Sequence, residues 1–90
     1  MSLQSRMREK LLIALNPTRL DVVNESHQHA GHASSPGTGE SHFRVLIVSS
    51  DFTGKSRVER HRIVNELLKD ELRDGVHALA IKALAPGEKT

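Results

Sequence analysis

The sequence predicts an α/β (α+β) fold with elements in the order α-β-β-α-β, in which helices cover one face of a three-stranded mixed sheet. Two stretches with apolar residues at helical spacing indicate amphipathic helices, and three runs rich in β-branched and apolar residues indicate strands. A short connection between the first two strands favours antiparallel pairing, whereas a helical crossover predicts that the second and third run parallel. With 90 residues, 37% of them hydrophobic, the chain is expected to form one domain, residues 1–90, around one modest core.

The first helix is predicted from apolar residues at every fourth position near the N-terminus: Leu3, Met7, Leu11 and Leu15. It should end at Asn16, because Pro17 disfavours helical geometry in the residue before it. The following stretch RLDVVNES has alternating, β-branched character and predicts the first strand. FRVLIVSS is nearly apolar throughout, which predicts a second strand that is central in the sheet or buried on both faces.

The second helix is expected to open at a capping box, S-x-x-E, formed by Ser56 and Glu59, and to run to a C-terminal cap at Gly75. Its predicted buried stripe consists of Val64, Leu67, Leu68 and Leu72. VHALAIKALA then predicts the last strand, before Pro86 and a polar tail over residues 86–90.

Composition excludes several functional classes. The chain has no cysteine, so it forms no disulfide and carries no thiolate nucleophile, and a reducing compartment fits best. No stretch approaches the roughly 20 apolar residues that span a bilayer, and the basic N-terminus MSLQSRMREKLL is read as part of the first helix rather than as a targeting peptide. A net charge of +2 permits contact with phosphate without requiring it, and the absence of Trp and Tyr weakens a role in binding single strands.

Four of the six histidines lie in residues 24–43, NESHQHAGHASSPGTGESHF, which predicts a flexible, exposed loop over about residues 27–41. His27 and His29 would point to the same side of an extended segment and could share a cation, with His32 or Glu25 as a third ligand. The spacing alone favours an ordinary polar loop. His77 lies two and four residues before Leu79 and Ile81, so in a strand it would point to the same face as these two, which are expected to face the core. This favours a partly buried histidine with a backbone partner.

Four cations gather at the start of the second helix: Lys55, Arg57, Arg60 and Arg62. A helix N-terminus among cations could take a phosphate, although a solvated helix face is the commoner arrangement. His42 and His61 are expected to be structural. The chain shows no paired nucleophile and base and no standard metal motif, so we expect no enzyme activity; a phosphodiesterase or nuclease built on Asp51 is the least favoured alternative.

Three blocks of the sequence together carry a resemblance to a known family. They are NESHQHAGH, then ESHFRVLIVSSDFTGKSRVERHRIVNELLKDEL, then VHALAIKALAP, and RHR followed by HAL is their most characteristic part. In this order and at these spacings the chain resembles the BolA-like protein family from the first helix to Pro86. The resemblance implies a class II KH-like fold. The loop between HQH and ESHF is longer than in many members.

The resemblance also implies a function, that of an adaptor which binds a monothiol glutaredoxin and co-ligates a [2Fe–2S] cluster for iron–sulfur trafficking or iron signalling. His29 and His77 match the positions of the family's ligands, glutathione and the glutaredoxin supply thiolates, and His27 and His32 are additional candidates. No cofactor is expected in the isolated chain, which would be a monomer or a weak homodimer in the cytoplasm, the nucleus or, after processing, an organelle. The alternative is a DNA- or RNA-binding regulator that uses the basic cluster, although the G-x-x-G clamp of KH domains is absent.

Overall fold

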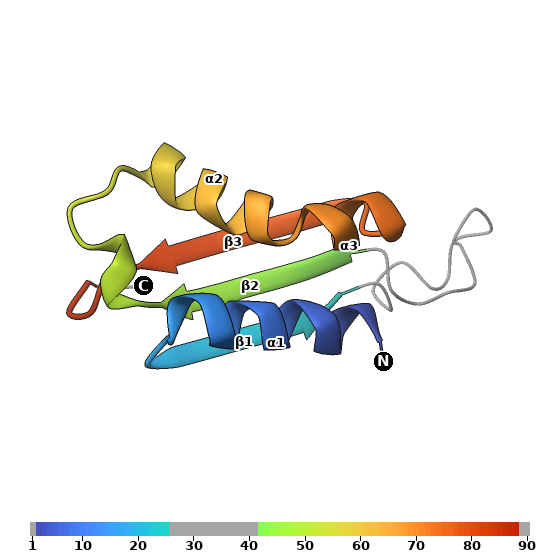
Figure 1. The fold of residues 1–90 in the computed structure, drawn as a ribbon, viewed down its shortest axis with the longest axis horizontal. Helices are drawn as coiled ribbons and strands as arrows, with labels where there is room; N and C mark the ends of the chain where they lie inside the picture. Colours follow the sequence, from blue (N-terminus) through green and yellow to red (C-terminus); the bar gives the residue numbers. More distant parts are fainter. Residues whose placement is uncertain (1, 26–41, 89–90) are drawn as a thin grey trace.

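A computed structural model describes residues 2–25 and 42–88 of the chain (Figure 1). The elements follow in the order α1 (Leu3–Leu15), β1 (Arg19–Asn24), β2 (His42–Val48), the 3-10 turn η2 (Ser50–Phe52), α2 (Arg57–Leu67), α3 (Lys69–Asp74) and β3 (Ala78–Leu84). The predicted fold class is confirmed, with η2 and α3 as additions. Within the described ranges, no helix has both the length and the apolar character that crossing a membrane requires.

The sheet has the strand order β1-β2-β3, with β2 in the centre. As predicted, β1 pairs antiparallel with β2 and β2 pairs parallel with β3; the register places Val22 and Ile81 on either side of Val45. Figure 1 shows α1 alongside β1, and α2 alongside β3. The helices enclose a hydrophobic core, mostly aliphatic but including Phe43 and Phe52, against one face of this sheet.

The burial of β2 follows from this one-sided arrangement. Phe43, Val45 and Ile47 are buried against the helices, whereas Arg44 on the opposite face is exposed and Leu46 is only half-buried. The prediction of a central strand is therefore right and that of burial on both faces is wrong. No helix within residues 2–25 and 42–88 covers the second face.

Helix α1 forms where the four-residue apolar spacing predicts it. The Ser2 side chain accepts a hydrogen bond from the Ser5 amide at its start, and the helix ends where Asn16 adopts a left-handed conformation with φ 42°. Met7, Leu11 and Leu15 are buried on the sheet side. The capping box at the start of α2 is also present, since Ser56 and Glu59 each hydrogen-bond the other's backbone amide.

The predicted single helix from Ser56 to Gly75 is interrupted, which the sequence pattern did not indicate. Leu68, with φ −103° and ψ 14°, separates α2 from α3. Val64 and Leu68 of the predicted stripe are fully buried, and Leu67 and Leu72 are half-buried and pack against the core. Glu71 is the buried residue of α3.

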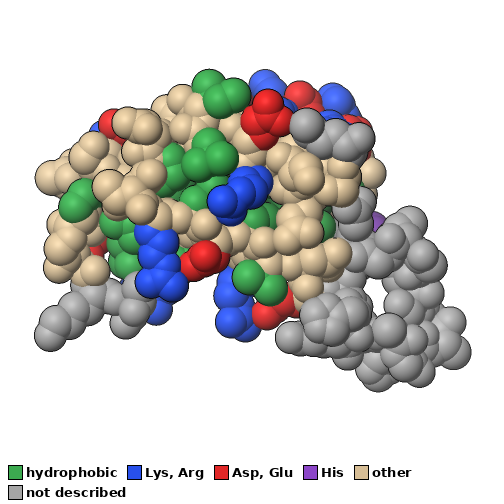
Figure 2. Space-filling view, turned by 90° about the horizontal axis from the view of Figure 1, so that it is seen from below, with side chains coloured by type: hydrophobic (Ala, Val, Ile, Leu, Met, Phe, Trp, Pro, Cys, Tyr) green, Lys and Arg blue, Asp and Glu red, His purple; other side chains and the backbone are tan. Residues whose placement is uncertain are grey.

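The surface carries charges of both signs. Figure 2 shows lysine and arginine side chains interspersed with acidic ones on the face seen from below. Positive charge is therefore not gathered into one broad patch on this face. Elsewhere on the surface, on α2 and α3, neighbouring charges form ion pairs, among them Lys69 with Glu66 and Arg73 with Asp70.

Candidate functional site

The first candidate site lies at the end of the sheet where His77 is found. Asn24, the last residue of β1, pairs with Phe43, and His42, the first residue of β2, pairs with Ala78. The end of β1 and the starts of β2 and β3 therefore lie together at one edge of the fold. His77 immediately precedes the first residue of β3.

The side chain of His77 is exposed at this edge. The expectation of a partly buried histidine is wrong, because β3 begins one residue later and the preceding turn buries Val76 in its place. This turn requires a residue with a positive φ at Gly75, which adopts φ 149° and closes α3 through a hydrogen bond from its amide to the Glu71 carbonyl. Within the described ranges, the His77 side chain has no hydrogen bond or ion pair, so its imidazole nitrogens are accessible to an incoming group.

Two described residues fix the strands on either side of the histidine-rich segment. The Glu25 amide donates a 2.8 Å hydrogen bond to the His42 carbonyl. The Glu25 carboxylate, whose side chain is 19% exposed, lies 2.9 Å from Arg44 Nη2. Both contacts join the end of β1 to β2, so Glu25 and His42, the described residues that flank this segment, lie at the end of the sheet that carries His77. This ion pair was not singled out from the sequence.

His27, His29 and His32, the other predicted ligands, lie outside the described residues. Among residues 2–25 and 42–88, no three or more His, Cys, Asp or Glu side chains are grouped so that they could hold a metal ion. An iron–sulfur cluster takes four protein or thiol ligands. The described residues could therefore supply only part of the ligand set of such a cluster, and the imidazole of His77 offers one accessible nitrogen.

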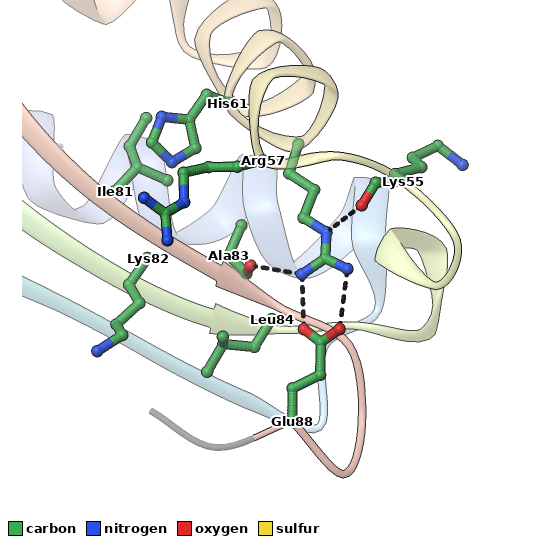
Figure 3. Close-up of a pocket in the computed structure, with 9 residues that line it drawn as sticks. Lys55, Arg57, His61, Ile81, Lys82, Ala83, Leu84 and Glu88 are labelled. Carbon is green, nitrogen blue, oxygen red and sulfur yellow. Dashed lines mark hydrogen bonds and ion pairs between the residues drawn. The ribbon is translucent and has the colours of Figure 1, made fainter.

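A second candidate site is a groove of about 710 Å³ between α2 and β3 (Figure 3). Lys55, Arg57 and His61 line it from the helix side, and Ile81 and Lys82 line it from the strand. His61 is half-buried there, and its ring lies close to Ile81 in Figure 3. Lys82 was not among the predicted binding residues, because it lies far along the chain from the basic cluster until the crossover brings β3 beside α2. His61 lies within that cluster in sequence but was expected to be structural.

The four predicted nucleic-acid-binding cations have different environments. Lys55 and Arg57 lie in the groove with exposed side chains. Arg62 is exposed on α2 and does not line the groove. Arg60 lines the groove, but its side chain is only 12% exposed and is engaged within the fold. The predicted cluster therefore divides into groove, outer-face and structural residues.

Arg60 joins α2 to the residues after β3. Its guanidinium donates hydrogen bonds to both oxygens of Glu88, at 2.6 and 3.0 Å, and to the carbonyl oxygens of Lys55 and Ala83 (Figure 3). Glu88 also accepts a 2.8 Å hydrogen bond from the Ala85 amide. The bonds from Arg60, followed by the one from Ala85, lower the pKa of Glu88 from 4.5 to about 2.

The substitution Glu88→Gln is expected to lower stability in a pH-dependent manner. A pKa depressed in the folded state stabilises the fold above the ordinary value of 4.5, and this stabilisation is lost as the pH falls towards about 2. The difference in unfolding free energy between wild type and variant should thus shrink over this interval, as measured by urea denaturation at a series of pH values. Glu66→Gln, at an exposed ion pair, is the control and should change little. A Glu88→Gln difference independent of pH would contradict the assignment.

Comparisons with known proteins agree with one another. A sequence model for the family described as BolA-like protein matches residues 11–88. An uncharacterized protein in the cobS 5' region of Sinorhizobium sp is 59% identical over 91 residues, covering 100% of this chain and 98% of that protein. SufE-like protein 1, chloroplastic/mitochondrial, from Arabidopsis thaliana is 52% identical over 87 residues, which cover 92% of this chain and 24% of the relative. The solved structure of BolA1 from Arabidopsis thaliana has 47% identity and a TM-score of 0.89, and the match covers 100% of this chain and 98% of that one.

Proposed function

The chain belongs to the BolA-like protein family, and on this basis we propose that it is a non-enzymatic adaptor that shares a [2Fe–2S] cluster with a monothiol glutaredoxin. His77 supplies one ligand and His29 a second, while the glutaredoxin cysteine and a glutathione thiol supply the others. The observation that carries the proposal is the accessible His77 side chain at the sheet end that also carries Glu25 and His42, the described residues that flank residues 26–41 in sequence. His27 and His32 are further candidates for the second position.

The chemistry of the donor set supports a shared site. A neutral imidazole nitrogen is a competent iron ligand, and replacing thiolate with histidine raises the reduction potential of such a cluster. The chain has no cysteine, so every thiolate must come from a partner. His77 is exposed and immediately precedes the start of β3, which positions its backbone without enclosing the side chain. The proposed site needs glutathione, so any compartment that contains glutathione would suit it. This includes a chloroplast or a mitochondrion, the organelles in the name of the plant relative.

The proposal is tested by adding the chain anaerobically to a glutathione-loaded [2Fe–2S] monothiol glutaredoxin while following visible circular dichroism. We expect a new spectrum that saturates at equal stoichiometry. His77→Ala and His29→Ala should each alter or abolish it, because each removes one nitrogen ligand. His61→Ala is the matched control, since it removes a histidine from α2 and should leave the spectrum unchanged.

The His77→Ala result is informative because the fold should tolerate the change. Exposed side chains without internal partners typically contribute within about 0.5 kcal/mol to stability, and His77 is such a residue. Urea denaturation of the variant should therefore match wild type. An unaltered spectrum with folded His77→Ala would remove His77 as a ligand, and no spectral change with wild type would overturn the adaptor proposal.

The alternative of a DNA- or RNA-binding regulator receives less support. Arg60 is neutralised by Glu88, which leaves fewer free cations than the sequence indicates. Both phenylalanines of the chain, Phe43 and Phe52, are buried, so neither offers a ring on which a base could stack. Oligonucleotide binding is included as an outcome of the experiment described next.

A further inference from the structure

The outer edge of β3 presents unpaired backbone groups. The strand order β1-β2-β3 gives β3 a single neighbour. In a parallel ladder, alternate residues direct both their N–H and their C=O groups to that neighbour. The Leu84 carbonyl accepts a 2.9 Å hydrogen bond from the Ser49 amide, so Leu84 and the residues two and four positions before it face β2. Leu79, Ile81 and Ala83 therefore direct their backbone groups to the outer edge.

Most of these outward groups lack a partner in the described part of the chain. Arg60 Nη1 lies 3.0 Å from the Ala83 carbonyl and occupies that acceptor. Within residues 2–25 and 42–88, no turn, loop or side-chain hydrogen bond ends on the backbone of Leu79 or Ile81. An edge with free donors and acceptors is a template for a further strand.

The groove beside this edge carries uncompensated positive charge. In Figure 3 the Arg57 side chain extends from α2 towards β3, near Ile81 and Lys82. The side chains of Arg57, Lys82 and Lys55 form no ion pair with any residue that the structure describes. Because Arg60 is neutralised by Glu88, these three side chains set the charge that a ligand in the groove would meet.

From these observations we propose that the outer edge of β3 binds an extended acidic segment of another protein by β-strand addition. Main-chain bonds to Leu79 and Ile81 supply affinity in this mode, and side-chain contacts supply selectivity. Carboxylates of the added strand pair with Arg57 and Lys82. The proposal does not depend on the iron–sulfur function, since it uses neither His77 nor a cluster.

Charge and composition favour an acidic segment of another protein over a second copy of the chain and over a nucleic acid. A second copy of the chain paired through β3 would bring Arg57 and Lys82 near their own counterparts, and like charges at an interface are unfavourable. A lysine on an edge strand is a common protection against self-association. A nucleic acid would gain from the cations, but the buried phenylalanines provide no stacking surface and a backbone edge offers it no matching ladder.

The test uses the full chain labelled with ¹⁵N and a short capped peptide of alternating glutamate and valine. Amide resonances of Leu79 and Ile81 should shift on titration, and their hydrogen exchange should slow by about tenfold or more, because outward amides become bonded.

Arg57→Glu/Lys82→Glu should weaken binding by about tenfold or more. Both positions are exposed, so the variant should fold. Arg62→Glu/Lys69→Glu makes the same change in net charge outside the groove and should bind like wild type.

A second peptide with N-methyl groups at alternate backbone nitrogens keeps the side chains but cannot complete the ladder. It should not bind, and equal binding would overturn strand addition. Equal weakening by the two charge reversals would also overturn the proposal by showing non-specific attraction. The proposal would also be overturned if the peptide did not bind. If a single-stranded oligonucleotide instead shifted the same resonances, the nucleic-acid alternative would be favoured.

Discussion

Replacing both cations that contact Glu71, in the variant Arg6→Ala/Lys10→Ala, is expected to lower the unfolding free energy by about 3–5 kcal/mol, because a buried charge then loses its compensation. Glu71 is fully buried in α3. Its Oε1 accepts a 2.9 Å hydrogen bond from Lys10 Nζ, and its Oε2 lies 3.0 Å from Arg6 Nη2, an ion pair without hydrogen-bond alignment. The bond to Glu71 raises the pKa of Lys10 above its ordinary value.

The effect should be non-additive. Each single variant leaves one cation beside Glu71, so the double variant should lose more than the sum of the two single losses. Urea denaturation at neutral pH measures all three. Lys69→Ala/Arg73→Ala is the matched control, because it removes two cations from exposed pairs on the same helix and should cost less than about 1 kcal/mol. Similar losses of unfolding free energy in both double variants would show that the Glu71 carboxylate does not depend on Arg6 and Lys10 to balance its charge.

Phe52→Ala is expected to have a comparable effect, about 3–5 kcal/mol, as large core truncations to alanine do. Phe52 is fully buried although it lies in a short connection between β2 and α2. Its amide donates to the Ser49 carbonyl, and the buried Ser49 hydroxyl donates to the Leu15 carbonyl at 2.7 Å. The turn therefore inserts the ring into the core and ties the end of α1 to the end of β2.

Thermal and urea denaturation of Phe52→Ala measure the loss. Val58→Ala, which shortens a side chain that is 60% exposed on α2, serves as the control and should stay within about 0.5 kcal/mol of wild type. A small loss for Phe52→Ala would mean that η2 collapses inward to fill the space. That result would contradict the role assigned to the turn, which is to hold the Phe52 ring in the core.

The parts of the fold that depend on neighbouring residues in sequence were predictable. The spacing of Met7, Leu11 and Leu15 marks α1, and the pairing of Ser56 with Glu59 marks the start of α2. The break at Leu68 and the burial of Glu71 were not predictable in the same way. The burial of Glu71 depends on cations of α1 that are 61 or more residues away in sequence, and no local pattern reports such a partner.

The candidate sites were predicted less completely than the fold. The residue type and place of His77 were identified, but its parity with Leu79 suggested burial, which the start of β3 one residue later prevents. Arg60 looked like one cation among four, because its carboxylate partner lies 28 residues further along. The groove and the outer edge of β3 arise from the crossover itself, so spacing alone could not indicate them.

The contact between Lys10 and Glu71 also constrains how the molecule acquires its structure during synthesis. The first helix leaves the ribosome long before its compensating carboxylate is made, since the two residues are 61 positions apart. The parallel partner of β2 is translated later still. Non-local pairings of this kind slow folding, so the emerging N-terminal half must remain soluble without its completed core. Acquisition of the native state is therefore expected to await the last strand, as a single late event rather than a gradual one.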